Sequence, residues 1–258
     1  MLRTLWFSLA AAGILYSSVC VALFCFQRSL LYVPQAGLGD QSAKILTLQN
    51  QTEQILVSTR PGYGSKALLY FGGNAEDVSQ SLGDFSVTFP DSAVFLMHYR
   101  GYGGSSGRPS EKALFSDALA LFDKVHPKFP EVEVIGRSLG SGVAVYLASQ
   151  RPVERLVLVT PFDSVQEIAA AQFPFFPVRW LLLDKYESWR FAPSVTAPTL
   201  IIAAEDDEVI PRKSSELLLS RFKRGLTTFV VIRHASHNAI SNSPEYLPLL
   251  KGLPRSDR

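Results

Sequence analysis

The stretch that most constrains this chain is Gly-Arg-Ser-Leu-Gly, which runs from Gly136 to Gly140. A run rich in β-branched residues, Val132–Ile135, precedes it, and a small-residue pattern typical of a helix, Val143–Ser149, follows it. A G-x-S-x-G sequence between a strand and a helix predicts a sharp turn that holds its serine in a strained backbone conformation. Such a turn exposes the serine hydroxyl and directs the first N–H groups of the helix toward whatever that hydroxyl attacks. We therefore interpret Ser138 as a nucleophile, rather than as one serine in a glycine-rich turn.

The composition limits the class of protein. The chain has 258 residues, of which 47% are hydrophobic and 19% charged, which is enough for one large domain once the N-terminal segment is set aside. A net charge of +2 without a long basic run argues against a nucleic-acid partner. Cys20 and Cys25 both lie in the N-terminal apolar segment, so the rest of the chain has neither a disulfide nor a cysteine metal site. The pattern implies no cofactor and no metal.

The N-terminal segment predicts a membrane anchor. Residues 4–26 carry no charge and are numerous enough for a helix to cross the hydrocarbon core. The alternative is a cleaved signal peptide, whose apolar region is shorter and ends at a small-x-small cleavage site. The segment has no clear site of that kind, so we expect an uncleaved anchor over residues 1–28 and a folded domain over residues 29–258. Basic residues flank both ends of the apolar segment, so the orientation in the membrane stays open.

The remainder of the chain alternates between strand and helix patterns. Two strand-like runs, Lys44–Gln49 and Gln54–Thr59, predict an antiparallel entry into a sheet. Apolar strands then alternate with helices, the strands being Lys66–Phe71, Ala93–Met97, Val132–Ile135, Arg155–Val159, Thr199–Ala203 and Thr228–Ile232, and the helices Glu111–Val125, Val143–Ser149, Ser214–Phe222 and one from about Pro244. This alternation predicts an α/β fold with a mostly parallel sheet covered by helices on both faces.

One segment departs from the alternation. Residues 163–190 are rich in phenylalanine, tryptophan and proline, and they fall between two predicted strands, above the carboxyl edge of the sheet. They fit an ordinary helical excursion with core aromatics. They fit equally well a short lid that lines an acyl pocket and touches the bilayer.

A serine hydroxyl needs a base, an orienting carboxylate and N–H donors for the oxyanion, and in a fold with this turn the acid and then the base follow the serine in the chain. Four consecutive carboxylates, Glu205 to Glu208, follow the strand Thr199–Ala203, and composition does not choose among them. His234 and His237 follow the last strand, and we favour His237 because it lies in a loop of small residues.

Two other histidines, His98 and His126, precede Ser138 and are disfavoured by chain order.

The oxyanion donors are expected from the N–H of Leu139, directly after the nucleophile, and from an N–H in the glycine-containing loop Gly72–Asp77.

Four blocks of sequence, together spanning residues 66–240, resemble a known family: Tyr70–Ala75, Tyr99–Gly107, Gly136–Gly140, and Asp207–Pro211 with Ala235–Asn238. The chain is similar to the α/β-hydrolase superfamily. More narrowly, it resembles the membrane-anchored serine hydrolases that include mammalian protein depalmitoylases and their bacterial and fungal relatives.

The resemblance implies an α/β-hydrolase fold after one N-terminal transmembrane helix, and it assigns roles to particular residues. Asp207, four residues before a proline, is implied as the acid, His237 as the base, and the N–H of Asn74 as an oxyanion donor beside that of Leu139. The chain departs from its relatives at Gly72, where they usually have histidine, and at Ser236, where they often have glycine. Neither departure removes a member of the implied triad of Ser138, Asp207 and His237.

The expected function is therefore that of a membrane-anchored serine hydrolase, which cleaves carboxylic ester or thioester bonds of a small-molecule or lipid acyl substrate through an acyl-enzyme. Acyl transfer and a cofactor-free peroxidase-type reaction are rival chemistries on the same fold. A catalytically silent interaction module and a lipid-binding protein are rivals of another class. The acyl chain, the leaving group and the oligomeric state do not follow from the sequence.

Overall fold

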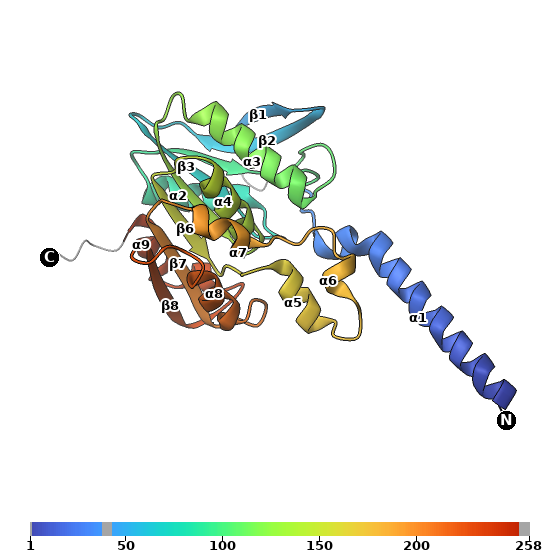
Figure 1. The fold of residues 1–258 in the computed structure, drawn as a ribbon. Coiled ribbons are helices and arrows are strands. Elements are labelled where there is room, and N and C mark those ends of the chain that lie inside the picture. The colour runs from blue at the N-terminus through green and yellow to red at the C-terminus, as the bar shows by residue number, and fades with distance from the viewer. Residues whose placement is uncertain (1, 38–42, 253–258) are drawn as a thin grey trace.

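An eight-stranded sheet with the strand order β1-β2-β4-β3-β5-β6-β7-β8 forms the centre of the computed structural model, which describes residues 2–37 and 43–252 (Figure 1). The strands are β1 (Lys44–Asn50), β2 (Glu53–Arg60), β3 (Lys66–Phe71), β4 (Ala93–Met97), β5 (Glu131–Arg137), β6 (Arg155–Val159), β7 (Thr199–Asp206) and β8 (Thr227–Ser236). The β1–β2 and β2–β4 pairs are antiparallel, and every pair from β4 through β8 is parallel. The outer limits of the two expected regions, Met1 and Arg258, lie outside the described residues.

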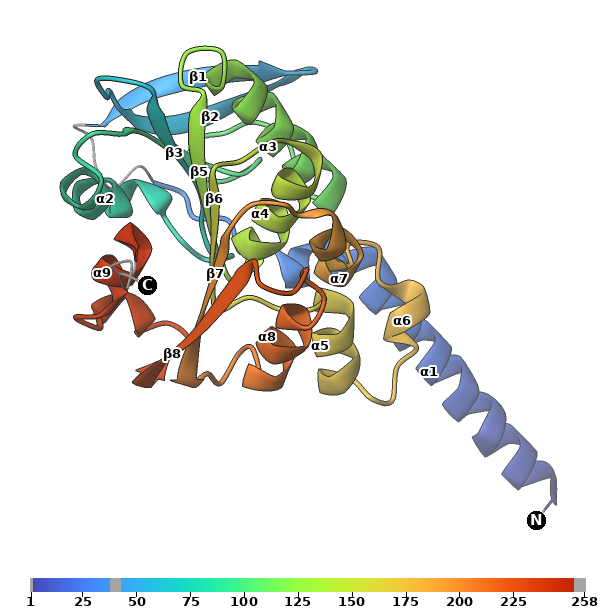
Figure 2. The same ribbon diagram turned by 60° about the vertical axis from the view of Figure 1, so that its left-hand side comes forward.

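Helices cover both faces of this sheet. The α-helices are α1 (Leu2–Leu31), α2 (Leu82–Thr88), α3 (Glu111–Val125), α4 (Leu139–Gln150), α5 (Val165–Gln172), α6 (Val178–Leu181), α7 (Ser188–Phe191), α8 (Arg212–Leu219) and α9 (Tyr246–Lys251). The short 3-10 helices among the described residues are η1 (Val78–Ser81), η2 (Ala192–Ser194) and η3 (Ile240–Asn242). Figure 2 shows the sheet nearly edge-on, with α2 and α9 on one side and α3, α4 and α8 on the other.

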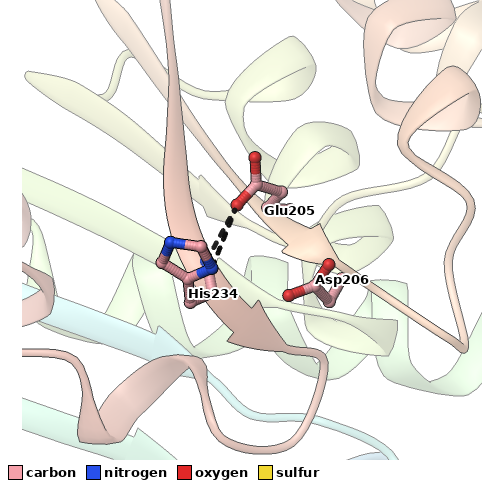
Figure 3. A group of neighbouring side chains, drawn as sticks. All are labelled: Glu205, Asp206 and His234. Carbon is pink, nitrogen blue, oxygen red and sulfur yellow. Dashed lines mark hydrogen bonds and ion pairs between the residues drawn. The ribbon is translucent and has the colours of Figure 1, made fainter.

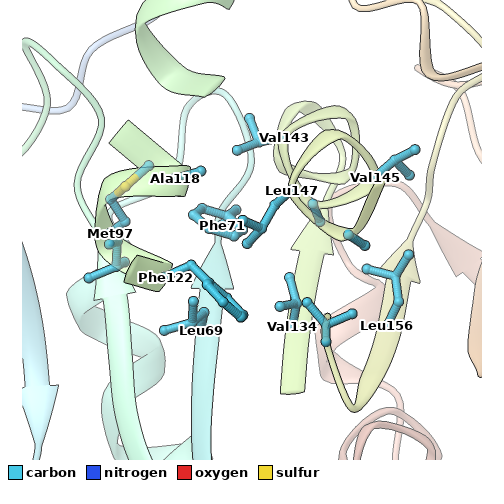
Figure 4. Close-up of a cluster of buried hydrophobic side chains, with 14 of the residues drawn as sticks. Leu69, Phe71, Met97, Ala118, Phe122, Val134, Val143, Val145, Leu147 and Leu156 are labelled. Atoms are coloured by element: carbon cyan, nitrogen blue, oxygen red, sulfur yellow. The ribbon is translucent and has the colours of Figure 1, made fainter. Parts of the chain in front are cut away.

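The two-residue period of a strand sends alternate side chains of β3 into two separate cores. Leu69 and Phe71 belong to the core under α3 and α4, where Figure 4 shows them among side chains from both helices and the neighbouring strands. Leu68 and Tyr70 point to the other face and pack with residues of α2 and α9. All four are buried, and this burial on both faces explains why β3 reads as a continuous apolar run.

The predicted α/β architecture is confirmed: the sheet is mostly parallel and helices lie on both of its faces. Strands β3, β4 and β6 and helix α3 have the bounds expected from the sequence. Ser110 caps α3 by accepting the N–H of Ala113. Helix α4 begins at Leu139, four residues before the predicted Val143, because the serine turn leads directly into it. Helix α8 starts at Arg212 and ends at Leu219 rather than spanning Ser214–Phe222, and α2 was not predicted.

Helix α1 is long and apolar enough to cross a membrane, with a mean hydropathy of 2.2 in its most apolar window. It continues to Leu31, three residues past the end of the expected anchor at residue 28. The segment 163–190 forms α5, α6 and the start of α7, and Figures 1 and 2 both place α6 beside α1.

A buried ion pair between Arg100 and Asp117 of α3 predicts a large loss of stability when it is broken. Asp117 is fully buried and accepts two hydrogen bonds of 2.8 Å from the Arg100 guanidinium. Replacing Asp117 with alanine leaves a buried charge without its partner, which lowers the free energy of unfolding by about 3–5 kcal/mol. On the same helix, Asp123 pairs with Arg151 at the surface, so Asp123→Ala is the matched control, expected to cost at most about 1 kcal/mol. Urea unfolding of both variants measures the difference, and equal losses would contradict this assignment.

The buried His98 predicts a loss of stability in mild acid. Burial lowers the pKa of His98 to about 4, and its Nε2 lies 2.8 Å from Ser58 Oγ. Between about pH 6.5 and pH 4 the unfolded chain binds a proton at this histidine that the folded chain does not. Stability is therefore lost as the pH falls through that window, by up to about 3 kcal/mol. Urea unfolding at pH 8 and pH 5 should show a smaller pH dependence for His98→Gln than for the wild type, and parallel pH dependences would be inconsistent with a buried neutral His98.

Candidate active site

Ser138 occupies a strained turn between β5 and α4. Its backbone has φ 49° and ψ −117°, which is unfavourable for a residue with a side chain. Three hydrogen bonds hold the turn. The Ser138 N–H donates to the carbonyl of Val159 on β6 over 2.9 Å, and the Ser138 carbonyl accepts the N–H of Ser141 over 2.9 Å and the Ser141 hydroxyl over 2.6 Å. The conformation expected from the G-x-S-x-G pattern is therefore present.

The two glycines of the pattern are required by the close approach of α4 to the sheet. A Cβ at Gly140 would lie 2.0 Å from the carbonyl oxygen of Phe71 at the end of β3. A Cβ at Gly136 would lie 2.4 Å from the carbonyl oxygen of Gly140. Both distances are far below a permitted contact with backbone, so any other residue would push the helix away from the strands.

Hydrogen bonds connect Ser138 to His237 and His237 to Asp207. The Nε2 atom of His237 lies 3.0 Å from Ser138 Oγ, and its Nδ1 atom lies 2.9 Å from the nearer Asp207 oxygen. The side chains of His237 and Asp207 are only 6% and 4% exposed. Asp207 also accepts the N–H groups of Val209 and Ile210, which hold its carboxylate in the turn that follows β7.

The candidates that compete with these two residues form a separate group. Figure 3 shows Glu205, Asp206 and His234 at the ends of β7 and β8, with His234 turned toward Glu205. The His234 N–H donates to Glu205 over 3.0 Å, and the His234 Nδ1 lies 3.8 Å from the same carboxylate. Although one potential metal-ligand atom from each residue lies within 4.8 Å of the others, all three residues are exposed to water. The fourth carboxylate, Glu208, accepts the backbone N–H of His237.

Asn74 and Leu139 line the same cavity as Ser138. Leu139 is the first residue of α4, so its N–H has no acceptor within the helix. The side chain of Asn74 makes contacts that the sequence did not anticipate. It donates to the carbonyl of Leu31 at the end of α1 over 2.6 Å, and its oxygen accepts the Tyr102 hydroxyl over 2.8 Å. These bonds fix the loop after β3 to the end of the N-terminal helix.

Sequence reasoning also missed Glu76, which supports the same loop. Its carboxylate accepts the Gly73 N–H over 2.7 Å and the Tyr70 hydroxyl over 2.6 Å. Burial, reinforced by the negative charge of Glu76, raises the pKa of Tyr70 well above 10. The phenol therefore stays protonated and remains a donor to Glu76.

Arg137, the residue before Ser138, joins the Glu76 carboxylate to the loop after β8 that contains His237. Its guanidinium pairs with Glu76 over 3.2 Å, and it donates to the carbonyls of His237 and Asn238 over 3.4 Å. The only signal in the sequence was a pair of opposite charges, one in the glycine-containing loop and one inside the G-x-S-x-G pattern. That signal indicates a contact only once the two loops are known to meet.

An apolar cavity of about 450 Å³ opens from Ser138. Its walls come from α1, from the segment 163–190 and from the turn after β7. The residues involved, besides Asn74, Ser138 and Leu139, are Leu23, Phe24, Gln27, Leu30, Leu31, Phe162, Val165, Ile168, Ala169, Gln172, Phe173, Phe176, Val178, Leu181, Leu182, Val209 and Ile210. A hydroxyl within hydrogen-bond reach of an imidazole, which itself contacts a carboxylate, is the arrangement that activates a nucleophile.

Relatives with similar sequences occur in bacteria and animals, although no family model matches the chain. An uncharacterized protein of Mycobacterium tuberculosis, Rv2307c, is 34% identical over 250 residues, which cover 89% of this chain and 86% of that protein. The rat lysophosphatidylserine lipase ABHD12 is 32% identical over 79% of this chain. The Caenorhabditis elegans α/β hydrolase domain-containing protein aho-3 is 34% identical over 72% of it. The chain spans about 56% of the length of each of these two animal proteins.

Solved structures agree with the sequence relatives on the fold. The esterase Pf2001 of Pyrococcus furiosus superposes on 85% of this chain with a TM-score of 0.66 and 17% identity. Mouse α/β hydrolase domain-containing protein 10 superposes on 81% of it with a TM-score of 0.62 and 15% identity. Together with the strand order, the serine turn and the relatives above, these likenesses show that the chain belongs to the α/β-hydrolase family.

Proposed function

We propose that this chain is a membrane-anchored serine hydrolase that cleaves the carboxylic ester or thioester bond of a lipid-like acyl substrate. The observation that carries the proposal is the series of hydrogen bonds from Ser138, which lines an apolar cavity, through His237 to Asp207. The name of the rat relative, a lysophosphatidylserine lipase, supports ester cleavage on a lipid. The length and apolar composition of α1 support anchoring in a membrane.

The proposed reaction begins at Ser138. His237 Nε2 takes the hydroxyl proton as Oγ attacks the acyl carbonyl carbon, and Asp207 keeps the imidazole oriented and stabilises its positive charge. The carbonyl oxygen of the resulting tetrahedral intermediate accepts hydrogen bonds from the N–H groups of Asn74 and Leu139.

Collapse of this intermediate breaks the bond to the alcohol or thiol, and His237 returns its proton to that leaving group. Water then attacks the acyl-enzyme with His237 again as the base, which releases a carboxylic acid and regenerates Ser138. Every step uses side chains and backbone groups of this chain.

The intact hydrogen-bonded residues argue against a catalytically silent module. A protein that only binds lipid has no need for a strained serine turn, which costs about 1–3 kcal/mol. Nor does it need a buried imidazole held between a hydroxyl and a carboxylate, as His237 is here.

We predict that Ser138→Ala abolishes both covalent labelling and turnover. The full-length protein in detergent should gain one fluorophosphonate adduct by intact-mass measurement, and the variant none. Hydrolysis of p-nitrophenyl esters should fall by about three orders of magnitude or more, because the nucleophile is lost. Thermal unfolding of the variant should show no loss of stability, since the hydroxyl is not part of the core. An adduct that persists in Ser138→Ala would refute the assignment.

We predict different effects for two adjacent carboxylates. Asp207→Ala removes the partner of the His237 ring and should lower kcat by about 10³–10⁴-fold. Asp206→Ala is the matched control, because Asp206 is exposed in the group of Glu205 and His234, and it should change kcat by no more than about twofold. Steady-state hydrolysis of p-nitrophenyl butyrate compares the two variants. The opposite ranking would mean that Asp206 is the acid.

A further inference from the structure

We infer that helix α1 is a wall of the acyl pocket as well as an anchor, and that the pocket takes a long acyl chain laterally from the hydrocarbon core of the membrane. This inference rests on the proposed function. Its basis is the set of contacts between α1 and residues 173–186, a segment more than 140 residues away in the sequence that we call the insertion tip.

One face of α1 is turned toward the insertion tip. Tyr16, Leu23, Gln27 and Leu31 follow at intervals of seven, four and four residues, and therefore share one side of a helix. Leu23, Gln27 and Leu31 line the cavity that contains Ser138. Val21, by contrast, is 61% exposed and is not among the cavity residues. An anchor that served only as a tether would need no such division between its faces.

Polar bonds hold this face of α1 in place. The Gln27 amide donates to the Leu181 carbonyl over 3.2 Å and accepts the Leu183 N–H over 2.7 Å, so it satisfies backbone groups at the end of α6. Arg28 pairs with the buried Asp184 through bonds of 2.8 and 3.2 Å. Gln27 and Arg28 lie at the end of the apolar segment, where polar side chains can remain near the membrane surface.

The insertion tip follows α1 into the membrane region. Tyr16 donates to the carbonyl of Phe175 over 2.9 Å, and its ring stacks on Phe176 with centroids 5.9 Å apart. Tyr16 lies ten residues before Phe26, the last residue of the apolar segment. At 1.5 Å per helical residue this is about 15 Å, or roughly half of the hydrocarbon core.

The first part of the tip and the residues just before it have a composition that suits that position. Residues 168–178 carry no charge. Phe175 is 84% exposed and Trp180 is 89% exposed, so two large aromatic side chains project from the part of the domain nearest α1. The charges at the edge of this segment pair with each other, Arg179 with Glu167 over 2.7 Å. We infer that these aromatic side chains contact the hydrocarbon of the bilayer instead of water.

The cavity therefore runs between two elements that both lie against lipid. Leu23 and Leu30 of α1 form one side, Ile168 of α5 and Phe176 of the insertion tip form the other, and Ser138 also lines the cavity. An acyl chain can pass between α1 and the insertion tip without crossing water, while its ester group reaches Ser138. The substrate class that fits is a membrane-resident ester or thioester with a long acyl chain.

The test compares two tryptophan substitutions on α1 of the full-length protein in phosphatidylcholine vesicles. Leu23→Trp places a larger side chain in the cavity, and Val21→Trp places the same side chain on the outer face. We expect Leu23→Trp to lower kcat/KM for p-nitrophenyl palmitate by about tenfold or more and to change kcat/KM for p-nitrophenyl acetate by less than about twofold. Val21→Trp should leave both values within about twofold of the wild type.

The outcomes separate this inference from the proposed function. If Leu23→Trp and Val21→Trp have equal effects on palmitate, or if Leu23→Trp affects palmitate and acetate alike, α1 is not a wall of the acyl pocket even though the hydrolase assignment stands. If the wild type cleaves neither ester and gains no fluorophosphonate adduct, both proposals fail.

A second measurement reports on the tip without activity. Vesicles of phosphatidylcholine brominated on the acyl chains should quench the fluorescence that Trp180 contributes, obtained as the difference between the wild type and Trp180→Phe. Quenching supports insertion of the tip, and an unquenched Trp180 would overturn it.

Discussion

The close approach of α4 to strands β3 and β5 sets the position of Ser138, on which the geometry of the candidate site depends. Gly140 allows the helix to contact the end of β3, and Gly136 allows the strand to pass beneath the helix. The serine between them is consequently held in a conformation with positive φ, at the carboxyl edge of the sheet. The loops after β3, β7 and β8 end at the same edge, so the partners of the serine come from those loops.

An ion pair couples these loops electrostatically. Glu76 and Arg137 are largely shielded from water, at 14% and 15% side-chain exposure. Glu76 accepts the N–H of Gly73 in the loop after β3, and Arg137 donates to the carbonyl of His237 in the loop after β8. A charged pair in such a place is retained only if most of its polar atoms find partners. Because these bonds hold the two loops together, the proposed backbone donors need little reorganisation during a reaction, which is the condition for effective oxyanion stabilisation.

The loop after β3 also joins the site to the N-terminal helix. The Asn74 side chain bonds to the last residue of α1, while its backbone N–H is the proposed oxyanion donor. The position of the site relative to α1 is thereby set by short polar contacts at the end of that helix, together with the Arg28–Asp184 pair. A domain cut at residue 29 would lose Arg28, Gln27 and part of the cavity wall.

Much of this protein follows from short-range patterns in its amino-acid sequence. The period of apolar residues predicted β3, β4, β6 and α3 with their bounds, and the G-x-S-x-G turn located Ser138, because these signals act over a few neighbouring residues. Local patterns did not choose among four consecutive carboxylates and the family resemblance pointed to Asp207, whose contact with the His237 ring appears in the tertiary structure, because neighbouring side chains at a strand end point in different directions. The tertiary structure alone revealed Glu76 and the contacts of α1 with the insertion tip, because those partners are 61 and more than 150 residues apart and meet only when the sheet brings their loops together.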